Sequence, residues 1–166
     1  FENNVFLVAQ HMMQFAATGQ AAAPMPSRIS AWGVYDVFTV KGMPGIKVPM
    51  PVVIGLDLAG TITELGEGVA DWAVGDRVLV NPLNKKKGLM GEMLDGGMAE
   101  YCRVAVDQLI RMPDGVSFEQ AASLPVAYGT AHRMIVTHNT IKPGDKVLIL
   151  GASGGVGMLA PPNIDE

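Results

Sequence analysis

Glycine is concentrated in one short stretch of the chain, and its spacing there favours nucleotide binding. The stretch reads Gly151-Ala152-Ser153-Gly154-Gly155-Val156-Gly157 and directly follows the almost continuously apolar run Lys146–Leu150. Glycines permit a tight turn and a close approach of the backbone to a pyrophosphate, whose charge faces the N-terminus of the following helix. Such an apolar run is typical of a strand buried in a parallel sheet, so the pattern predicts a dinucleotide-binding turn.

Cysteine and histidine are too few and too scattered to predict a metal site. Cys102 is the single cysteine, which excludes an intramolecular disulfide and a multi-cysteine zinc site. His132 and His138 are six residues apart and would not share one helix face as residues at i and i+4 do. We therefore predict no metal site, and we expect Cys102 to be a buried, inert thiol on a strand.

The composition excludes several classes of partner. Of the 166 residues, 49% are apolar and 17% are charged, which permits a hydrophobic core. The net charge of −4 and the aromatic content of 6% argue against nucleic-acid binding. Polar side chains interrupt the uncharged stretch Asn3–Ser27, and no positive residue precedes its apolar run, so we predict neither a membrane span nor a signal peptide. A cytoplasmic protein fits these features.

Short apolar runs between glycine and proline turns predict a β-rich middle for the chain. The expected strands are Pro51–Ile54, Ala59–Leu65, Arg77–Val80, Met98–Val106 and Gln108–Met112. Several short strands at this spacing are typical of an antiparallel barrel or sandwich. We therefore expect the α/β character suggested by the glycine turn to be confined to the end of the chain.

After Pro113 the pattern becomes helical. Ser117 and Gln120 are spaced as a capping box in front of an apolar stretch. Pro125 should break or restart the helix, and Gly129 is a candidate close-packing point in the second helix. The expected elements are a helix over Phe118–Leu124, a helix over Val126–Thr137, a turn over Lys142–Asp145 and the strand Lys146–Leu150.

Six motifs then follow one another in a characteristic order. They are Pro51–Gly60, Leu65–Val69, Gly75–Val78, Gly96–Tyr101, Leu124–Ala131 and Gly151–Gly157. In this order they resemble the medium-chain dehydrogenase/reductase superfamily, and the resemblance runs from about Asp36 to Gly157. It implies a GroES-like, partly open β-barrel that carries the substrate, followed by a Rossmann domain that binds NAD(P). Hydride transfer is expected in the cleft between the two.

The resemblance also bears on zinc. Zinc-dependent members carry a Cys in the segment that corresponds to Gly33–Asp36, a His where Leu56 stands, a ligand near Pro125, and four cysteines in the stretch Asn81–Gly96. Leu56 and Pro125 offer no ligand atom, and Asn81–Gly96 contains no cysteine. The chain is therefore more similar to the zinc-independent quinone oxidoreductase and enone reductase group. This implies NADPH or NADH as cofactor, no zinc, and a quinone or α,β-unsaturated carbonyl as substrate.

Without a metal, negative charge on the substrate oxygen must be met by hydrogen-bond donors. Tyr35 and Tyr128 are the candidate catalytic residues by position, with core or interface packing as the alternative role. Thr130 corresponds to a family threonine near the nicotinamide ribose, with helix packing as its alternative, and Gly33 stands where many members have Asn. The implied cofactor-binding residues are Thr130, Gly151, Ser153, Gly154, Gly155, Val156 and Gly157.

We expect three parts in the chain. Residues 1–32 form an arm without the family's pattern, residues 33–116 the GroES-like barrel, and residues 117–166 the connecting helices and the truncated start of the Rossmann domain. In the arm, Val5, Val8, Met12 and Phe15 fall at helical spacing, which indicates a poorly ordered or helical segment.

The glycine turn stands close to the end of the sequence. Only nine residues follow Gly157, whereas a strand–helix–strand unit needs about 30 residues. We therefore expect an inactive fragment that is prone to associate, and a homo-oligomer for the full-length parent. Two alternatives stay open, namely a relative of the zinc-type alcohol dehydrogenases and a non-catalytic β-barrel interaction module.

Overall fold

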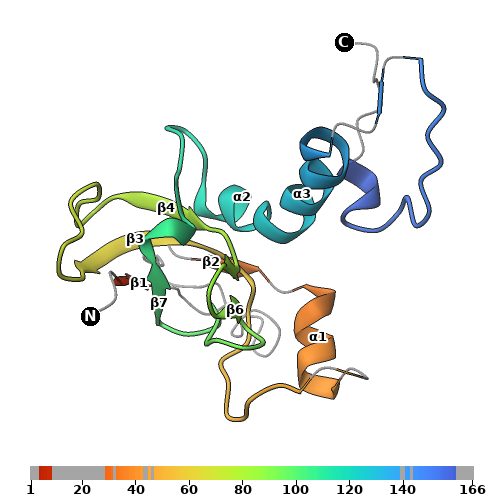
Figure 1. Ribbon diagram of the computed structural model, residues 1–166. Coiled ribbons are helices and arrows are strands. Elements are labelled where there is room, and N and C mark those ends of the chain that lie inside the picture. Colours follow the sequence, from red (N-terminus) through yellow and green to blue (C-terminus); the bar gives the residue numbers. More distant parts are fainter. Residues whose placement is uncertain are drawn as a thin grey trace, which may run out of the picture.

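The computed structural model describes residues 4–8, 29–31, 33–42, 45, 47–138, 141–142 and 144–159. These form a curved antiparallel sheet with helices beyond one end of it (Figure 1). The strands are β1 (Asn4–Val8), β2 (Ile29–Ala31), β3 (Asp57–Leu65), β4 (Arg77–Val80), β5 (Leu83–Asn84), β6 (Gly88–Leu89), β7 (Tyr101–Ala105) and β8 (Leu109–Arg111). The helices are α1 (Val34–Lys41), α2 (Phe118–Ala122) and α3 (Pro125–His132), with 3-10 turns at Val106–Gln108 and Gly157–Leu159 and a π-helical turn at Arg133–Thr137.

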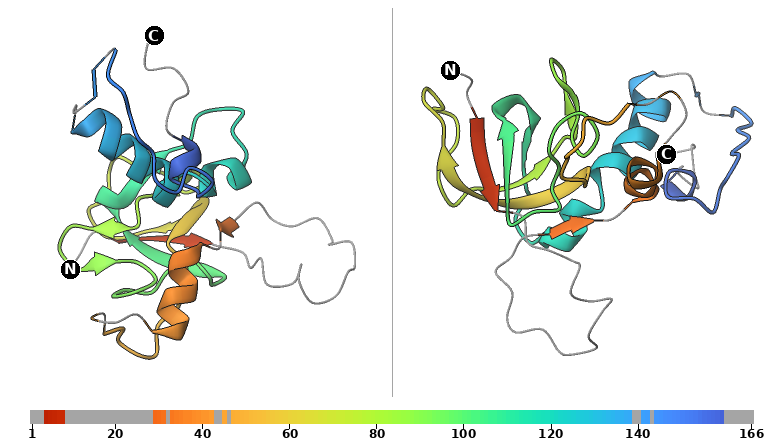
Figure 2. Two further views of the ribbon diagram at one scale, coloured as in Figure 1. Left: turned by 90° about the vertical axis from the view of Figure 1, so that its right-hand side faces the viewer. Right: turned by 90° about the horizontal axis from the view of Figure 1, so that it is seen from below.

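The main sheet has the strand order β7-β1-β3-β4-β8, and β2 pairs with the first residues of β3. β5 and β6 form a separate small hairpin. β3 is the longest strand and organises the sheet, because β2 and β1 share one of its edges and β4 takes the other. Figure 2 shows how the sheet curls into an open half-barrel, as expected for a partly open GroES-like barrel.

Alternation along the strands separates two cores. Leu58 and Ala59 are adjacent on β3, so their side chains point to opposite faces of the sheet. One core lies inside the half-barrel and consists of Leu58, Ile62, Val78, Val80, Met90, Cys102, Val104 and Leu109. The other lies between the sheet and α2 and consists of Ala59, Met112, Phe118, Ala121 and Ala122. The second core attaches the helical end of the chain to the barrel.

The capping box predicted before α2 is confirmed. The Oγ of Ser117 accepts a hydrogen bond from the Gln120 backbone N–H at 3.2 Å, and the Gln120 side chain accepts one from the Ser117 N–H at 2.9 Å. Pro125 restarts the helix as the first residue of α3, where its missing N–H costs no hydrogen bond. Gly129 is not a close-packing point, since a Cβ there would meet nothing within 4 Å among the described residues.

Two predicted strands are wrong. Pro51–Ile54 is irregular because its backbone bonds to a loop: Gly96 N–H donates to Val53 O at 2.7 Å, and Met98 N–H donates to Ile54 O at 2.9 Å. Lys146–Leu150 is also without regular structure, and Leu148 and Leu150 are 83% and 86% exposed. A strand needs a hydrogen-bonding partner, and no strand in the described part of the chain pairs with this run.

The expectation of a helical arm is also wrong where the structure describes the arm. Asn4–Val8 forms β1 and pairs antiparallel with both β3 and β7. The run Val5-Phe6-Leu7-Val8 has high β-propensity, and pairing on two sides outweighs a helical spacing too short to nucleate a helix. Met12 and Phe15 lie outside the described residues. No described helix has the length and hydrophobicity needed to cross a membrane.

Candidate active site

The three segments that correspond to zinc-ligand positions in the resemblance converge at one end of β3. Ala31 of β2 lies opposite Asp57, the first residue of β3, and α1 begins at Val34, three residues after Ala31. The backbone N–H of Val126, on the first turn of α3, donates to Oδ1 of Asp57 at 2.8 Å. Figure 1 places α1 and α3 beyond the same end of the sheet. The beginnings of α1, β3 and α3 therefore meet.

Asp36 brings a buried carboxylate to this junction. It is 1% exposed, and its Oδ2 accepts a hydrogen bond from the Gly33 backbone N–H at 2.8 Å at the start of α1. Its Oδ1 is also buried and has no hydrogen-bond partner among the described residues. A buried carboxylate oxygen without a hydrogen-bond donor is energetically costly, which distinguishes Asp36 from an ordinary surface aspartate.

Asp57 is the second carboxyl group at the junction. Burial raises its pKa to about 6, the hydrogen bond from Val126 opposes the rise, and the negative charge of Asp36 adds to it. The preceding residue, Leu56, is 4% exposed and packs in the core.

These residues do not fit a catalytic zinc ion. Catalytic zinc takes three protein ligands from His, Cys and carboxylates, and among the described residues of the junction only Asp36 and Asp57 are of these types. No group of three or more His, Cys, Asp or Glu side chains that could hold a metal occurs in the described ranges. His132 and His138 are both exposed.

The predicted catalytic tyrosines lie on α1 and α3, the two helices that meet at the junction. Tyr35 on α1 precedes Asp36 and packs edge-to-face against Phe38 at 6.4 Å between ring centroids. Tyr128 on α3 lies two residues after Val126. The two tyrosines are 43% and 46% exposed. Their catalytic role stays a prediction.

The glycine turn lies beside the same helix. Gly151 has φ +71°, Gly154 N–H donates to Gly151 O at 2.9 Å, and a Cβ on Gly157 would collide with that carbonyl oxygen. A Cβ on Gly155 would lie 3.6 Å from the Ala127 Cβ, so the turn reaches the first turn of α3. The turn is therefore compact, and Ser153 is exposed while Val156 and Thr130 are half-buried. The cofactor roles of these residues stay predictions.

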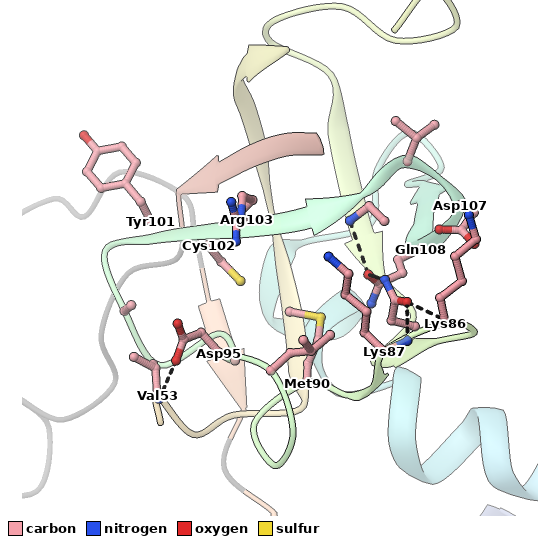
Figure 3. A pocket seen from close by; sticks show the side chains of 16 residues that line it. Val53, Lys86, Lys87, Met90, Asp95, Tyr101, Cys102, Arg103, Asp107 and Gln108 are labelled. Atoms are coloured by element: carbon pink, nitrogen blue, oxygen red, sulfur yellow. Dashed lines mark hydrogen bonds between the residues drawn. The ribbon is translucent and has the colours of Figure 1, made fainter. Parts of the chain in front are cut away.

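A separate cavity of about 840 Å³ lies on the barrel (Figure 3). β7 and the loop that contains Lys86, Lys87 and Asp95 line it, and neither Asp36 nor Asp57 does. Cys102 lines it as well and is 3% exposed; burial, with a smaller effect of the Asp95 charge, raises the pKa of this thiol to about 12. Cys102 is thus buried as predicted, and its raised pKa disfavours the reactive thiolate at neutral pH.

Asp36 and Asp57 are the functional candidates that the sequence reasoning missed. The available signal was positional: Asp36 is the third residue of a helix, and Asp57 is the first residue of a strand whose next three residues are buried. The convergence of the elements that carry them depends on the pairing of β2 with β3 and is not visible in the sequence.

Residues 28–114, more than half of the chain, match the family model of the alcohol dehydrogenase GroES-like domain. The quinone oxidoreductase of Sus scrofa is 34% identical over 147 residues, covering 84% of this chain and 42% of the relative. The crotonyl-CoA reductase of Streptomyces avermitilis is 39% identical over 126 residues, covering 65% of this chain and 28% of the relative. A solved thermostable alcohol dehydrogenase from Pyrobaculum aerophilum aligns with a TM-score of 0.73 and 25% identity, covering 95% of this chain and 46% of that one.

The GroES-like fold agrees with these matches. The chain belongs to the medium-chain dehydrogenase/reductase superfamily and has quinone oxidoreductases among its relatives. It spans less than half the length of each of the three proteins described above.

Proposed function

We propose that this chain contributes the substrate barrel and the cofactor turn of an NAD(P)H-dependent reductase that acts on a quinone, an enone or a related carbonyl compound without catalytic zinc. The observation that carries the proposal is the junction of α1, β3 and α3, whose described residues include two carboxyl groups and no group of three side chains that could hold zinc. The relationship to quinone oxidoreductases and to a crotonyl-CoA reductase supports the substrate class.

Bound NAD(P)H would supply the hydride. The backbone of Gly151–Gly157 would hold the pyrophosphate by N–H groups, and Thr130 would stand near the nicotinamide ribose. Tyr35 and Tyr128 would donate hydrogen bonds to the substrate oxygen, because that oxygen gains negative charge during reduction and no metal ion is assigned to meet it.

Cofactor binding is tested by isothermal titration calorimetry with NADPH and NADH, followed in parallel by Trp32 and Trp72 fluorescence. Saturable binding at micromolar cofactor is expected, and Gly154→Val should weaken it, because added bulk at position 154 presses on the Gly151 carbonyl oxygen, 3.2 Å from a Cβ there. Glu67→Gln, at an exposed position of the barrel, is the matched control. Absence of binding up to millimolar cofactor would refute the cofactor role and favour a non-catalytic barrel module.

Substrate class and metal use need separate measurements. We expect slow oxidation of NADPH with 1,4-benzoquinone or a simple enone, and low activity for this chain alone, since Lys146–Leu150 is unpaired among the described strands. Metal analysis of the purified protein should find substoichiometric zinc. Stoichiometric zinc that is required for activity would instead support a zinc-type alcohol dehydrogenase. We further propose a cytoplasmic location and a homo-oligomeric full-length parent.

A further inference from the structure

We propose that the cavity beside β7 is a docking site for an extended segment of a partner protein, which pairs with the free edge of β7 through its backbone and brings an acidic side chain to the cations of the cavity. The site is separate from the proposed reductase function, because Asp36, Asp57 and Gly151–Gly157 do not line this cavity. Three features support it: the edge position of β7, the course of the cavity along that edge, and the charges in its lining.

β7 is an edge strand of the main sheet. Among the described strands it pairs with β1 alone, in an antiparallel register that sets Cys102 opposite Leu7. The outer side of an edge strand presents N–H and C=O groups without a partner strand, and such a row is a template for pairing with another chain. β7 has five residues, a usual length for a strand, whereas β8 at the other edge has three. β7 is therefore the edge better suited to accept a strand.

The cavity runs along the free edge of β7 and not along one face of it. Successive side chains of a strand point to opposite faces, so a cavity on one face would be lined by every second residue. Instead Tyr101, Cys102 and Arg103 follow one another in the lining, and Ala105 lines the cavity as well. The β5–β6 hairpin and the loop that contains Asp95 provide the other walls (Figure 3). The cavity is thus a space beside the backbone of β7.

The N–H of Ala105 indicates which backbone groups face the cavity. It donates to Oε1 of Gln108 at 3.2 Å, and Gln108 lines the cavity. Along an antiparallel strand, the backbone groups of successive residues point alternately to one side and to the other. The N–H and C=O groups of Tyr101 and Arg103 therefore point to the same side as the Ala105 N–H. Because Gln108 already takes the Ala105 N–H, an incoming segment would pair along Tyr101–Arg103.

The lining of the cavity carries more positive than negative charges. Arg103, Lys86 and Lys87 line it and are exposed, and the two carboxylates of the lining are Asp95 and Asp107. Figure 3 shows Asp95 and Asp107 toward opposite ends of the view, with Arg103 and Lys87 between them. A partner segment with an acidic side chain would complement this central positive charge.

The inner wall of the cavity is apolar. Met90 and Cys102 are 1% and 3% exposed, and Leu94 is half-buried. Since a strand directs successive side chains to opposite faces, a segment that alternates apolar and acidic residues would turn the apolar ones to this wall and the acidic ones to Arg103. The uncharged stretch Asn3–Ser27 of this chain contains no acidic residue, so the charges favour a separate partner protein.

Binding is tested by fluorescence anisotropy of the full chain with a fluorescein-labelled heptapeptide that alternates valine and glutamate. We expect saturable binding at micromolar peptide, and binding at least about tenfold weaker for a peptide with lysine in place of glutamate. Lys86→Glu should weaken binding of the glutamate peptide about fivefold and strengthen binding of the lysine peptide. Absence of saturable binding, or equal binding of both peptides, would overturn the proposal.

Lys85→Glu is the matched control for Lys86→Glu. Both lysines are exposed neighbours in the loop between β5 and β6, but Lys85 does not line the cavity. The control should leave the affinity for both peptides within about twofold of the wild-type value, since its charge lies outside the site. Circular dichroism checks that both variants keep the fold. Equal weakening by the two variants would show a general charge effect and would refute a site in the cavity.

Backbone pairing is tested with the glutamate peptide methylated on every backbone nitrogen. Methylation removes the N–H donors from both edges of the peptide and keeps its side chains, so we expect at least about tenfold weaker binding. Amide hydrogen exchange followed by NMR should show the Arg103 N–H at least about tenfold more protected with saturating peptide, and Ile110 on β8, at the other edge of the sheet, unchanged. Equal binding of the methylated peptide, or unchanged exchange at Arg103, would refute strand addition.

A second copy of this chain at the edge of β7 would overturn the choice of partner. Sedimentation velocity would then show a dimer that Lys86→Glu dissociates and Lys85→Glu does not, and the glutamate peptide would compete with dimerisation. We expect instead that the two variants sediment as the wild-type chain does, because the partner segment comes from another protein.

Discussion

The carbonyl oxygen of Gly55 occupies the space that a side chain on Gly96 would need. A Cβ at position 96 would collide with this oxygen and would lie 2.7 Å from the carbonyl oxygen of Ile54. The contact exists because the loop after Gly96 bonds directly to the backbone of the segment before β3: Gly97 N–H donates to Gly55 O at 2.9 Å. This explains the glycine at position 96 as a requirement of close backbone approach.

Gly96→Ala should therefore destabilise the barrel. We expect a loss of about 2–3 kcal/mol in the free energy of unfolding, because rigid backbone atoms must shift to admit the methyl group. Gly129→Ala is the control: it lies within α3, where a Cβ meets open space, and should stabilise the protein by about 0.5–1 kcal/mol. Urea denaturation followed by circular dichroism measures both. Equal stabilities for the two variants would contradict the close approach.

Gln108 ties the end of β4 to the chain before β8. It is 2% exposed, its Nε2 donates to Asn81 O at 2.9 Å, and its Oε1 accepts from Asn84 Nδ2 at 3.0 Å and from Ala105 N–H at 3.2 Å. Gln108→Ala should cost about 2–4 kcal/mol of unfolding free energy, because it leaves buried polar groups unpaired and opens a cavity. Asp107→Ala, at the exposed neighbouring position, is the control. It should change the free energy of unfolding by less than about 0.5 kcal/mol in urea denaturation.

The raised pKa of Asp57 predicts an unusual dependence of stability on pH. The folded protein binds this proton up to about pH 6, whereas the unfolded chain releases it near 3.8. Since the native state holds more protons within this window, the free energy of unfolding falls as pH rises through it, by about 2 kcal/mol after allowance for the partial exposure of Asp57.

Thermal unfolding between about pH 5 and pH 7 tests this effect. Asp76 and Glu119 have lowered pKa values, caused first by hydrogen bonds from backbone N–H groups, and their contributions to stability are lost only toward more acidic pH. The decline between pH 5 and 7 should disappear in Asp57→Asn. A wild-type melting temperature that rises over this range would show the opposite sign and would contradict the buried carboxyl group.

Cys102 should resist thiol reagents in the native protein. Its side chain is buried and its pKa is raised to about 12, so the thiolate is scarce at pH 8 and access is blocked. We expect reaction with iodoacetamide to be at least about 10²-fold slower in the native chain than in urea. Rapid native labelling would show that the cavity beside β7 admits ligands to the thiol.

The exposed run Val147–Leu150 should promote association. Leu148 and Leu150 are almost fully exposed, and large exposed aliphatic side chains in unpaired extended backbone favour self-contact. Sedimentation velocity should reveal concentration-dependent association that Leu148→Ser together with Leu150→Ser reduces. Lys142→Ser, at the preceding turn, serves as the control. A monodisperse wild-type monomer with a sharp melt would refute this expectation.

The strands β3 and β4, the cap of α2 and the restart of the helix at Pro125 could be predicted from the sequence. Each depends on neighbours along the chain: alternation over β3 and β4, the Ser117–Gln120 spacing, and the geometry that proline imposes. The glycine turn could be recognised for the same reason, because positive φ and steric crowding at Gly151 and Gly157 are local requirements.

The tertiary structure alone decided whether Asn4–Val8 and Lys146–Leu150 form strands. Both runs are apolar and suited to a strand, but only the first finds partners, in β3 and β7. Likewise, the sequence contains Asp36 and Asp57 as two ordinary aspartates 21 residues apart. The meeting of their elements follows from strand pairing between β2 and β3 and from the hydrogen bond to Val126, 69 residues beyond Asp57. Local sequence sets backbone preferences, whereas pairing, burial and the pKa of a carboxyl group depend on residues that only folding brings together.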